Sequence, residues 1–280
     1  MENNFLKYRD EEASFDIHHT LTVGDDPKIQ RMRHEKYEIF TLLSDEARFY
    51  VEGKIYNMKK NDLMIFNSRE IHKVDFDKTK PYERWVFHFS KNAVLPFQTA
   101  NFNLLKAFEN RPLGMYNHIS AETAQRENIA DYFGKIKISL MNDEPGRDLM
   151  IKCYFIQMLI SINRVTTEAV RRSKNAEAEN KIEEILEYIN GNLTENLTLE
   201  NISERFFISK YYMAHLFKNS TGFSMNKYIS FKRVMMADEL MSNGMSATEA
   251  CAAVGFNDYS NFYKTFNKVL GRSPKNISRG

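Results

Sequence analysis

Cysteine and long apolar runs are both scarce in this sequence. Only two cysteines, Cys153 and Cys251, occur among its 280 residues, and they lie far apart. This spacing excludes a disulfide framework and a Cys-x-x-Cys metal pair, and it predicts a reducing, cytoplasmic setting. The longest apolar stretch, around 151–162, is interrupted by polar residues such as Lys152 and Ser161. That stretch is too short to span a membrane, so we expect no membrane contact.

An excess of charge of one sign is also missing. The formal net charge is +2, so the chain as a whole is not a polycation. Any binding to nucleic acid therefore requires positive charge to be gathered locally. Residues 1–16 are too polar for a signal peptide. The length suffices for two domains that each bury a core, and the composition is typical of a soluble globular protein.

The region from Phe15 to Phe89 has the pattern of short β-strands. Apolar and polar residues alternate through ARFYVEGKIYNM, residues 47–58, and turn signals such as Glu52-Gly53 and Lys80-Pro81 are frequent. Several short strands separated by such turns predict an antiparallel sandwich or barrel.

Residues 101–165 change to a helical period. Apolar residues recur at spacings of three and four, as in Ile129, Phe133 and Ile136, and the turn 143–146 divides the region into two helices. The next segment, 166–180, is polar and small without apolar periodicity. We therefore predict a first domain at 1–165, a linker at 166–178 and a second domain at 179–280.

The sequence of the second domain predicts helices throughout, and the residues that begin and end these helices recur in a repeated pattern. The pattern Phe217-x4-Gly222-x-Ser224 recurs as Phe266-x4-Gly271-x-Ser273, with Ser209 and Asp258 as the N-caps. A long helix over about 225–242 joins the two halves. Two halves with the same pattern of helix caps and stops predict two helix-turn-helix units in an all-α domain.

Charge is segregated within this second domain. Apart from Lys181, every charge in 177–204 is negative, and every charge in 205–233 is positive. Every charge in 234–258 is again negative, and every charge from 259 onward is positive. Because a merely solvated surface mixes signs, this order favours two edges that face the phosphates of nucleic acid.

Both parts of the chain resemble the AraC/XylS family, in which one long helix joins two helix-turn-helix units. The C-terminal resemblance spans about 181–277 and rests most specifically on Gly255-Phe256, Asp258, Ser260, Phe262, Phe266, Gly271 and Ser273-Pro274. The N-terminal third resembles the cupin-like domain of such regulators through His34, Tyr37-Glu38-Ile39, Asp62-Leu63 and Ile71-His72.

This resemblance implies both a fold and a function. The fold is α+β, with an N-terminal antiparallel, cupin-like β-barrel and a helical hairpin, followed by an all-α DNA-binding domain. The function is transcriptional regulation, more commonly activation than repression, controlled by a small effector in the barrel. The implied partners are double-stranded DNA, the effector, a second copy of the chain that pairs through the hairpin, and RNA polymerase.

The second helix of each unit supplies the candidate DNA contacts, since its N-terminal half reads bases in the major groove. Asn suits adenine and Lys suits guanine. The predicted base readers are Tyr211, Ala214, His215, Asn261 and Lys264, with Tyr259, Ser260 and Tyr263 as further candidates. Lys210, Lys218 and Lys268 are expected to face phosphate or the groove edge. Packing against a neighbouring helix is the alternative role for Tyr211 and Tyr263.

The candidate effector contacts combine aromatic and polar side chains, a mixture that suits a sugar or a similar polar metabolite. They are Phe15, His18, Arg33, His34, Tyr37, Glu38, His72, Trp85 and His88. For each of them, a role in the ordinary core or rim of the barrel is the alternative.

A metal-dependent cupin enzyme fused to a DNA-binding module is the alternative function. His34, Glu38 and His72 could gather on one sheet face, but Met32 stands where metal-binding cupins carry the first His of a His-x-His pair. No nucleophile stands beside a base. We therefore expect no catalytic residue, no metal and no cofactor. In a third alternative, the barrel is only a platform for dimerisation or a partner protein.

Overall fold

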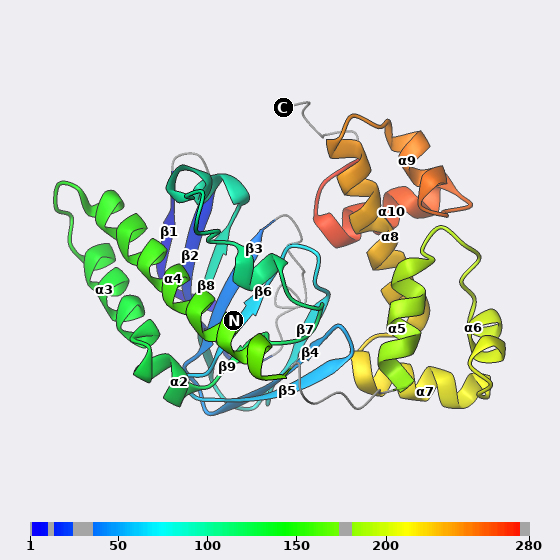
Figure 1. Cartoon of the computed structure of the whole chain (residues 1–280), viewed down its shortest axis with the longest axis horizontal. Coiled ribbons are helices and arrows are strands. Elements are labelled where there is room, and N and C mark those ends of the chain that lie inside the picture. The colour runs from blue at the N-terminus through cyan, green and yellow to red at the C-terminus, as the bar shows by residue number, and fades with distance from the viewer. Residues whose placement is uncertain (1, 11–13, 25–35, 174–180, 275–280) are drawn as a thin grey trace.

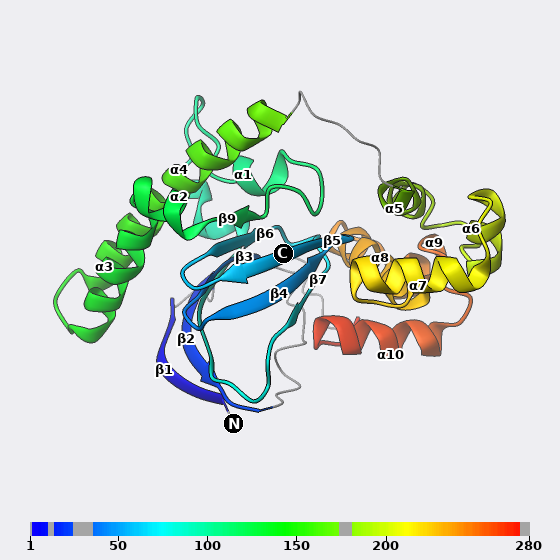
Figure 2. The same ribbon diagram turned by 90° about the horizontal axis from the view of Figure 1, so that it is seen from below.

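The strand-forming residues of the N-terminal domain build two antiparallel sheets that face each other (Figure 2). The computed structural model describes residues 2–10, 14–24, 36–173 and 181–274. One sheet has the order β1 (Glu2–Arg9), β2 (Phe15–Thr22), β8 (Tyr82–Phe89), β3 (Tyr37–Leu42), β6 (Leu63–Phe66), β9 (His118–Ile119). The other has the order β5 (Lys54–Lys59), β4 (Glu46–Val51), β7 (His72–Asp75). Among the described residues, the hydrogen bonds between strands define two separate sheets. They do not join the two sheets into the predicted closed barrel.

Alternation along the strands gives the larger sheet two different faces. Ile17, Ile39 and Phe87 point to a core shared with helices, and Phe40 and Phe66 point to a second core between the sheets. The helical layer is formed by α1 (Lys106–Glu109), α2 (Ala121–Arg126), α3 (Ile129–Met141) and α4 (Arg147–Ser173). Short 3-10 turns, η1 (Lys91–Ala93) and η2 (Leu95–Phe97), follow β8.

The helices α3 and α4 form the predicted hairpin, and Gly146 turns between them with a φ of +83°. Helix α4 continues to Ser173, so the predicted linker begins inside a helix. The reason is that Thr166 is buried and the following Thr-Glu-Ala-Val-Arg run can prolong an already packed helix without an apolar stripe of its own. The remainder of the predicted linker lies outside the described residues.

Six helices build the C-terminal domain: α5 (Lys181–Gly191), α6 (Leu199–Arg205), α7 (Lys210–Thr221), α8 (Met225–Ser242), α9 (Ala247–Ala253) and α10 (Tyr259–Leu270) among the described residues. In Figure 1, α8 runs between the pair α6–α7 and the pair α9–α10. Ser209 caps α7 through the Tyr212 N–H, and Asp258 caps α10 through the Ser260 and Asn261 N–H groups. Both α7 and α10 end at a left-handed glycine. The predicted caps and stops are therefore present.

The turns inside the two helix pairs match in backbone but differ in side chain. Phe207 follows α6 with a φ of +55°, and Gly255 follows α9 with a φ of +82°. The next residue in each turn donates its N–H back to the matching position, Ser203 or Cys251. Phe207 thus occupies a position that favours glycine, and its side chain is 94% exposed.

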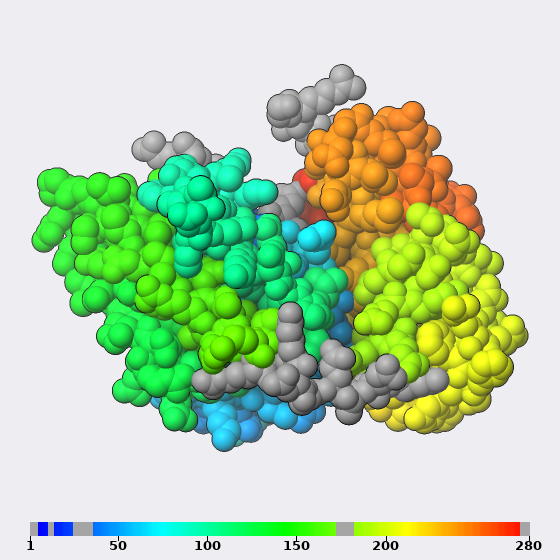
Figure 3. All heavy atoms as spheres, viewed as in Figure 1, coloured from blue at the N-terminus to red at the C-terminus, as the bar shows by residue number. Residues whose placement is uncertain are grey.

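Among the described residues, no helix has both the length and the apolar character needed to cross a membrane. The two domains lie against each other through the β4–β5 hairpin, which contacts α7. Figure 3 shows the sheet-rich domain on the left and the helical domain on the right of that contact.

Substitutions at the left-handed position of each turn should change stability in opposite directions. Phe207→Gly relieves about 1–2 kcal/mol of left-handed strain, partly offset by the entropy of glycine, so we expect a gain of up to about 1 kcal/mol. Gly255→Ala should instead cost about 1–2 kcal/mol, because its Cβ would lie 3.0 Å from the Arg233 guanidinium and 3.1 Å from the Thr194 carbonyl oxygen. Urea unfolding measures both, and a loss of stability in Phe207→Gly would contradict the strain.

Candidate ligand site and nucleic-acid interface

Three ionisable side chains lie in one row across neighbouring strands of the larger sheet. Asp16 of β2 pairs with His88 of β8, and His88 pairs with Glu38 of β3 on its other side. The His88 Nδ1 lies 3.1 Å from an Asp16 oxygen, and its Nε2 lies 3.3 Å from a Glu38 oxygen. Because the pairing register sets the row, these side chains share the face between the two sheets.

Further polar groups extend this row at both ends. The His18 Nε2 lies 2.8 Å from Asp16, and the Lys36 ammonium lies 2.6 Å from the other oxygen of that carboxylate. At the far end, the His72 Nε2 approaches Glu38 at 3.7 Å. We call the set Asp16, His18, Lys36, Glu38, His72 and His88 the inter-sheet polar cluster.

Charge pairing sets the protonation of this cluster. Burial by itself would raise the pKa of Asp16, but hydrogen bonds from His18, His88 and Lys36 hold it well below its usual range. Burial would likewise lower the pKa of His88, but its contacts with Asp16 and Glu38 raise it above 6.5. The site therefore offers anionic acceptors and cationic donors at short range, an arrangement that suits a ligand rich in hydroxyl groups.

The structure brings some of the predicted effector contacts together and separates others. His18, Glu38, His72 and His88 meet in the inter-sheet polar cluster, whereas Arg33 and His34 lie outside the described residues. Three others lie on the opposite face of the sheet, in the core with the helices: Phe15, Tyr37 and Trp85. For example, the ring of Phe15 packs 4.4 Å from that of Phe155.

Sequence reasoning missed Asp16 and Lys36. A signal for Asp16 was available, because it lies two residues before His18 and therefore shares its face of the strand. The same rule shows that Phe15 and His18, three residues apart in one strand, cannot both line one pocket. Lys36 precedes β3, and no strand pattern indicated its position.

Part of the cluster also has ligand atoms spaced as for a metal ion. Those of Asp16, His18 and His88 lie within 4.8 Å of one another. However, the Lys36 ammonium already pairs with the carboxylate, and its positive charge would oppose a divalent cation there. The donor set therefore fits a polar organic ligand better than a metal.

On α7, all five predicted contacts are exposed: Lys210, Tyr211, Ala214, His215 and Lys218. Met213 and Phe217 face the core from the opposite side, with 0% exposure. The rings of Tyr211 and His215 stack at a centroid distance of 6.4 Å. Tyr211 is 83% exposed, so packing against a neighbouring helix does not account for it.

On α10, Ser260, Asn261, Lys264 and Lys268 are exposed, whereas Tyr259 and Tyr263 are only half-exposed. Tyr259 packs against the edge of the helical core, near Phe262. In Figure 2, α7 and α10 run in roughly the same direction, each with one end toward the sheets.

Not every cation of the basic segments reaches this surface. The Arg233 guanidinium donates to the carbonyl oxygens of Leu193, Glu195 and Gly255, which ties α8 to two loops. Lys232 is buried against the N-terminal domain. The count of positive charges along the sequence therefore overestimates the basic surface of α8.

Comparison with known families accounts for both domains. Residues 23–159 match the AraC-like ligand binding domain, and residues 202–280 match a helix-turn-helix domain. The second match begins within α6 and covers α7, α8, α9 and α10.

Curated relatives match over most of the chain. The uncharacterized regulator YdiP of Escherichia coli K12 is 24% identical over 91% of this chain and 84% of its own length. The arabinose operon regulatory protein of the same strain is 24% identical over 82% of this chain and 75% of its own length. The crystal structure of ToxT from Vibrio cholerae O395 is 14% identical, covering 93% of this chain and 95% of that one, with a TM-score of 0.38.

These observations define a class of protein, the DNA-binding transcriptional regulators that carry an N-terminal ligand-binding domain. Within that class, the chain belongs to the AraC/XylS family.

The raised pKa of His88 predicts a pH-dependent contribution to stability. A group whose pKa is higher in the folded state stabilises fully below its unfolded value, here 6.5, and that stabilisation is lost as the pH rises through the folded value. The stability difference between the wild type and His88→Gln should therefore shrink from about pH 6 upward. Urea titrations across this range test it, and a difference independent of pH would contradict the assignment.

Proposed function

We propose that this regulator is a non-catalytic activator that places two helix-turn-helix units on one asymmetric DNA site. The observation that carries the proposal is the matched pair α7 and α10, each capped alike and each exposing a polar, basic face. Two such helices on one rigid domain can reach successive major-groove segments about 34 Å apart. The role of α8 is to hold that spacing.

Within this proposal the helices divide the work between bases and phosphates. Tyr211, Ala214 and His215 on α7 and Asn261 and Lys264 on α10 are the base readers. Lys210, Lys218 and Lys268 contact phosphate, although Lys210 must first release Glu200, whose carboxylate it holds at 2.9 Å. Ser260 remains a candidate reader, and Tyr259 and Tyr263 support the helix from its half-buried side.

Removing a base reader should relax specificity, and removing a phosphate contact should not. We expect Asn261→Ala and Lys264→Ala each to cost about 1–3 kcal/mol on a duplex selected by the wild type from a random library. Lys268→Ala should weaken binding to all sequences alike and lower the salt slope by about one. Ser242→Ala, at the exposed end of α8, is the matched control. Unchanged sequence-specific affinity in the combined His215→Ala and Lys264→Ala variant would refute the assignment.

The inter-sheet polar cluster is the proposed effector site, and a sugar or similar polyol is the proposed ligand. The support is chemical, because the cluster combines carboxylate acceptors with Lys and His donors whose side chains are mostly buried. The relatives include regulators of the arabinose and melibiose operons, so sugar-linked control occurs among similar proteins.

A thermal-shift screen with a panel of sugars tests this ligand class. A sugar that binds should stabilise the wild type by about 2.7 kcal/mol at a hundredfold excess over its Kd. Glu38→Gln should abolish that shift. The matched control is His118→Gln, a histidine that pairs with Asp62 at 2.9 Å outside the cluster. A shift that persists in Glu38→Gln would place the ligand elsewhere, and no shift with any polar metabolite would favour a pure platform.

A homodimer through the α3–α4 hairpin is part of the proposal. Ile138, Met141 and Leu149 are each more than 60% exposed near the hairpin turn, an apolar surface that suits a second copy. RNA polymerase is the further partner that activation requires.

The metal-dependent enzyme remains the second candidate, favoured by the spacing of Asp16, His18 and His88. Elemental analysis of the purified chain decides between the two. We expect substoichiometric metal, because Lys36 competes for Asp16. One bound metal per chain, lost in His88→Gln, would favour the enzyme.

A further inference from the structure

The contact between the two domains is built around the tip of the β4–β5 hairpin. Its turn is formed by Glu52 and Gly53, with φ values of +46° and +84°. A Cβ on Gly53 would lie 2.3 Å from Leu186 of α5, so the turn fits closely against the helical domain. Beside it, the ring of Tyr50 covers Gly222 at the end of α7. The DNA-binding helix α7 is therefore held directly by the sheet.

A buried ion pair lies at the centre of this contact. The Lys232 ammonium of α8 lies 2.6 Å from one Glu52 oxygen, and the Tyr228 hydroxyl donates to the other at 2.5 Å. The side chains of Lys232 and Glu52 are only 7% and 2% exposed. A pair so fully removed from water is stable only while both partners remain in place. The contact should therefore be made or broken as a unit.

The loop between β6 and β7 joins this ion pair to the inter-sheet polar cluster. The Ile71 N–H donates to Glu52 at 2.7 Å, and Lys232 donates to the Arg69 carbonyl oxygen at 3.2 Å. The Ile71 side chain is buried in the core of the helical domain. The next residue, His72, stacks on Phe66 and belongs to the polar cluster. Neighbouring residues thus contact the ligand site and the helical domain.

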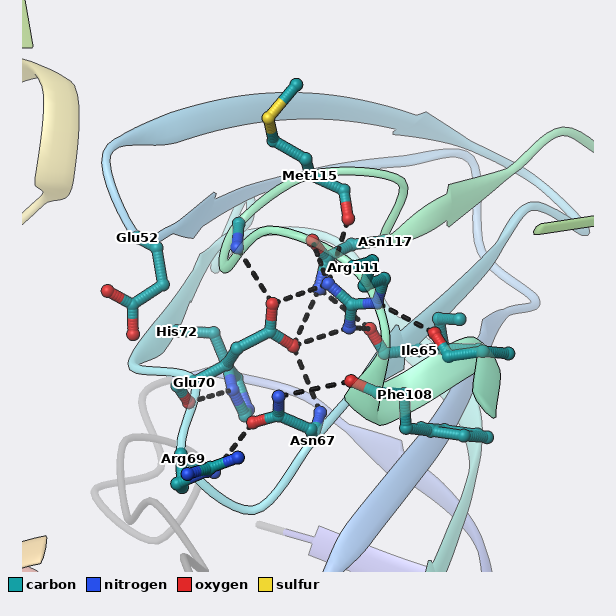
Figure 4. A network of polar contacts seen from close by, with 12 residues as sticks. Glu52, Ile65, Asn67, Arg69, Glu70, His72, Phe108, Arg111, Met115 and Asn117 are labelled. Carbon is teal, nitrogen blue, oxygen red and sulfur yellow. Dashed lines mark hydrogen bonds and ion pairs between the residues drawn. The ribbon is translucent and has the colours of Figure 1, made fainter. Parts of the chain in front are cut away.

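This loop is not free to move residue by residue. Glu70 is held by Arg111 through two contacts of 2.6 Å and by the Asn117 amide at 3.0 Å (Figure 4). The Glu70 carbonyl oxygen in turn lies 3.2 Å from His72 Nδ1. Movement of the His72 backbone would therefore act on Ile71 and on the ion pair through this short, hydrogen-bonded segment.

We propose that Glu52, Lys232 and Tyr228 form an interdomain latch, and that the segment 69–72 couples it to occupancy of the polar cluster. The coupling of the latch to the polar cluster rests on the proposed effector site, whereas the latch itself does not. An effector that displaces His72 would change the stability of the latch and so the placement of α7.

The latch is tested by the distance between the domains, without DNA or effector. Nitroxide labels are placed on the native, exposed Cys153 of α4 and on Ser242→Cys of α8. Cys251 is buried, so it should not take up a label. The full-length wild type should give one narrow distance distribution by pulsed electron resonance. Glu52→Gln and Lys232→Met should each add a second population. The matched control, Lys54→Gln, removes a half-exposed ion pair with Glu183 in the same interface and should change nothing.

Each outcome decides one part of the proposal. The latch is overturned if Glu52→Gln and Lys232→Met both keep the single, unchanged distance distribution while circular dichroism shows an intact fold. It is also overturned if Lys54→Gln broadens the distribution equally. His72→Gln should also broaden the distribution, whereas His118→Gln should not. If Glu52→Gln broadens it and His72→Gln does not, the coupling through 69–72 is wrong.

DNA binding separates this proposal from that of the reader residues. On the duplex selected by the wild type, Glu52→Gln should change Kd at least fivefold while the salt slope stays unchanged, since no DNA contact is removed. An unchanged Kd alongside a broadened distance distribution would show that the latch does not control DNA binding. Neither result depends on whether Asn261 and Lys264 read bases.

Discussion

The N-terminal domain depends on one ion pair from which water is excluded. The side chains of Glu70 and Arg111 are both 0% exposed, and the carboxylate also accepts hydrogen bonds from the Asn117 amide and from the N–H groups of Gly114 and Asn67. Such a pair is tolerated in a core only when every polar group is satisfied, so the network holds its backbone segments in one arrangement. The network therefore holds Ile71, which packs in the helical domain, and His72, which lies in the polar cluster, in a fixed position relative to each other.

The space between the sheets is divided by polarity. Phe40, Phe49 and Phe66 form an apolar core, and directly beside it the row from Asp16 to Glu38 gathers charge. A row of alternating acids and bases is stable there because each buried charge faces a partner. The space between the sheets thus combines an apolar part with a part whose donors and acceptors suit a ligand.

In the helical domain, cations serve two purposes that the sequence order does not distinguish. Lys232 and Arg233 are adjacent in α8, yet one joins the domains and the other clamps two loops within its own domain. The exposed cations that remain on α7 and α10 are fewer but lie on the faces opposite the buried Phe217 and Phe266. The proposed DNA surface is thus a property of two helix faces rather than of the basic segments as a whole.

The sequence by itself determined the local features: the antiparallel strands, the helical hairpin, and the capped, glycine-terminated helices α7 and α10 with α8 between them. These follow from alternation, periodicity and capping, which act within a few residues. Strand alternation was also sufficient to predict that Phe15, Tyr37 and Trp85 lie on the face opposite the polar cluster. Only the tertiary structure decided that Asp16, His88 and Glu38 form one row, because strand register joins positions 72 residues apart. It alone joined Glu52 to Lys232, 180 residues away, since burial of a charge depends on what packs around it.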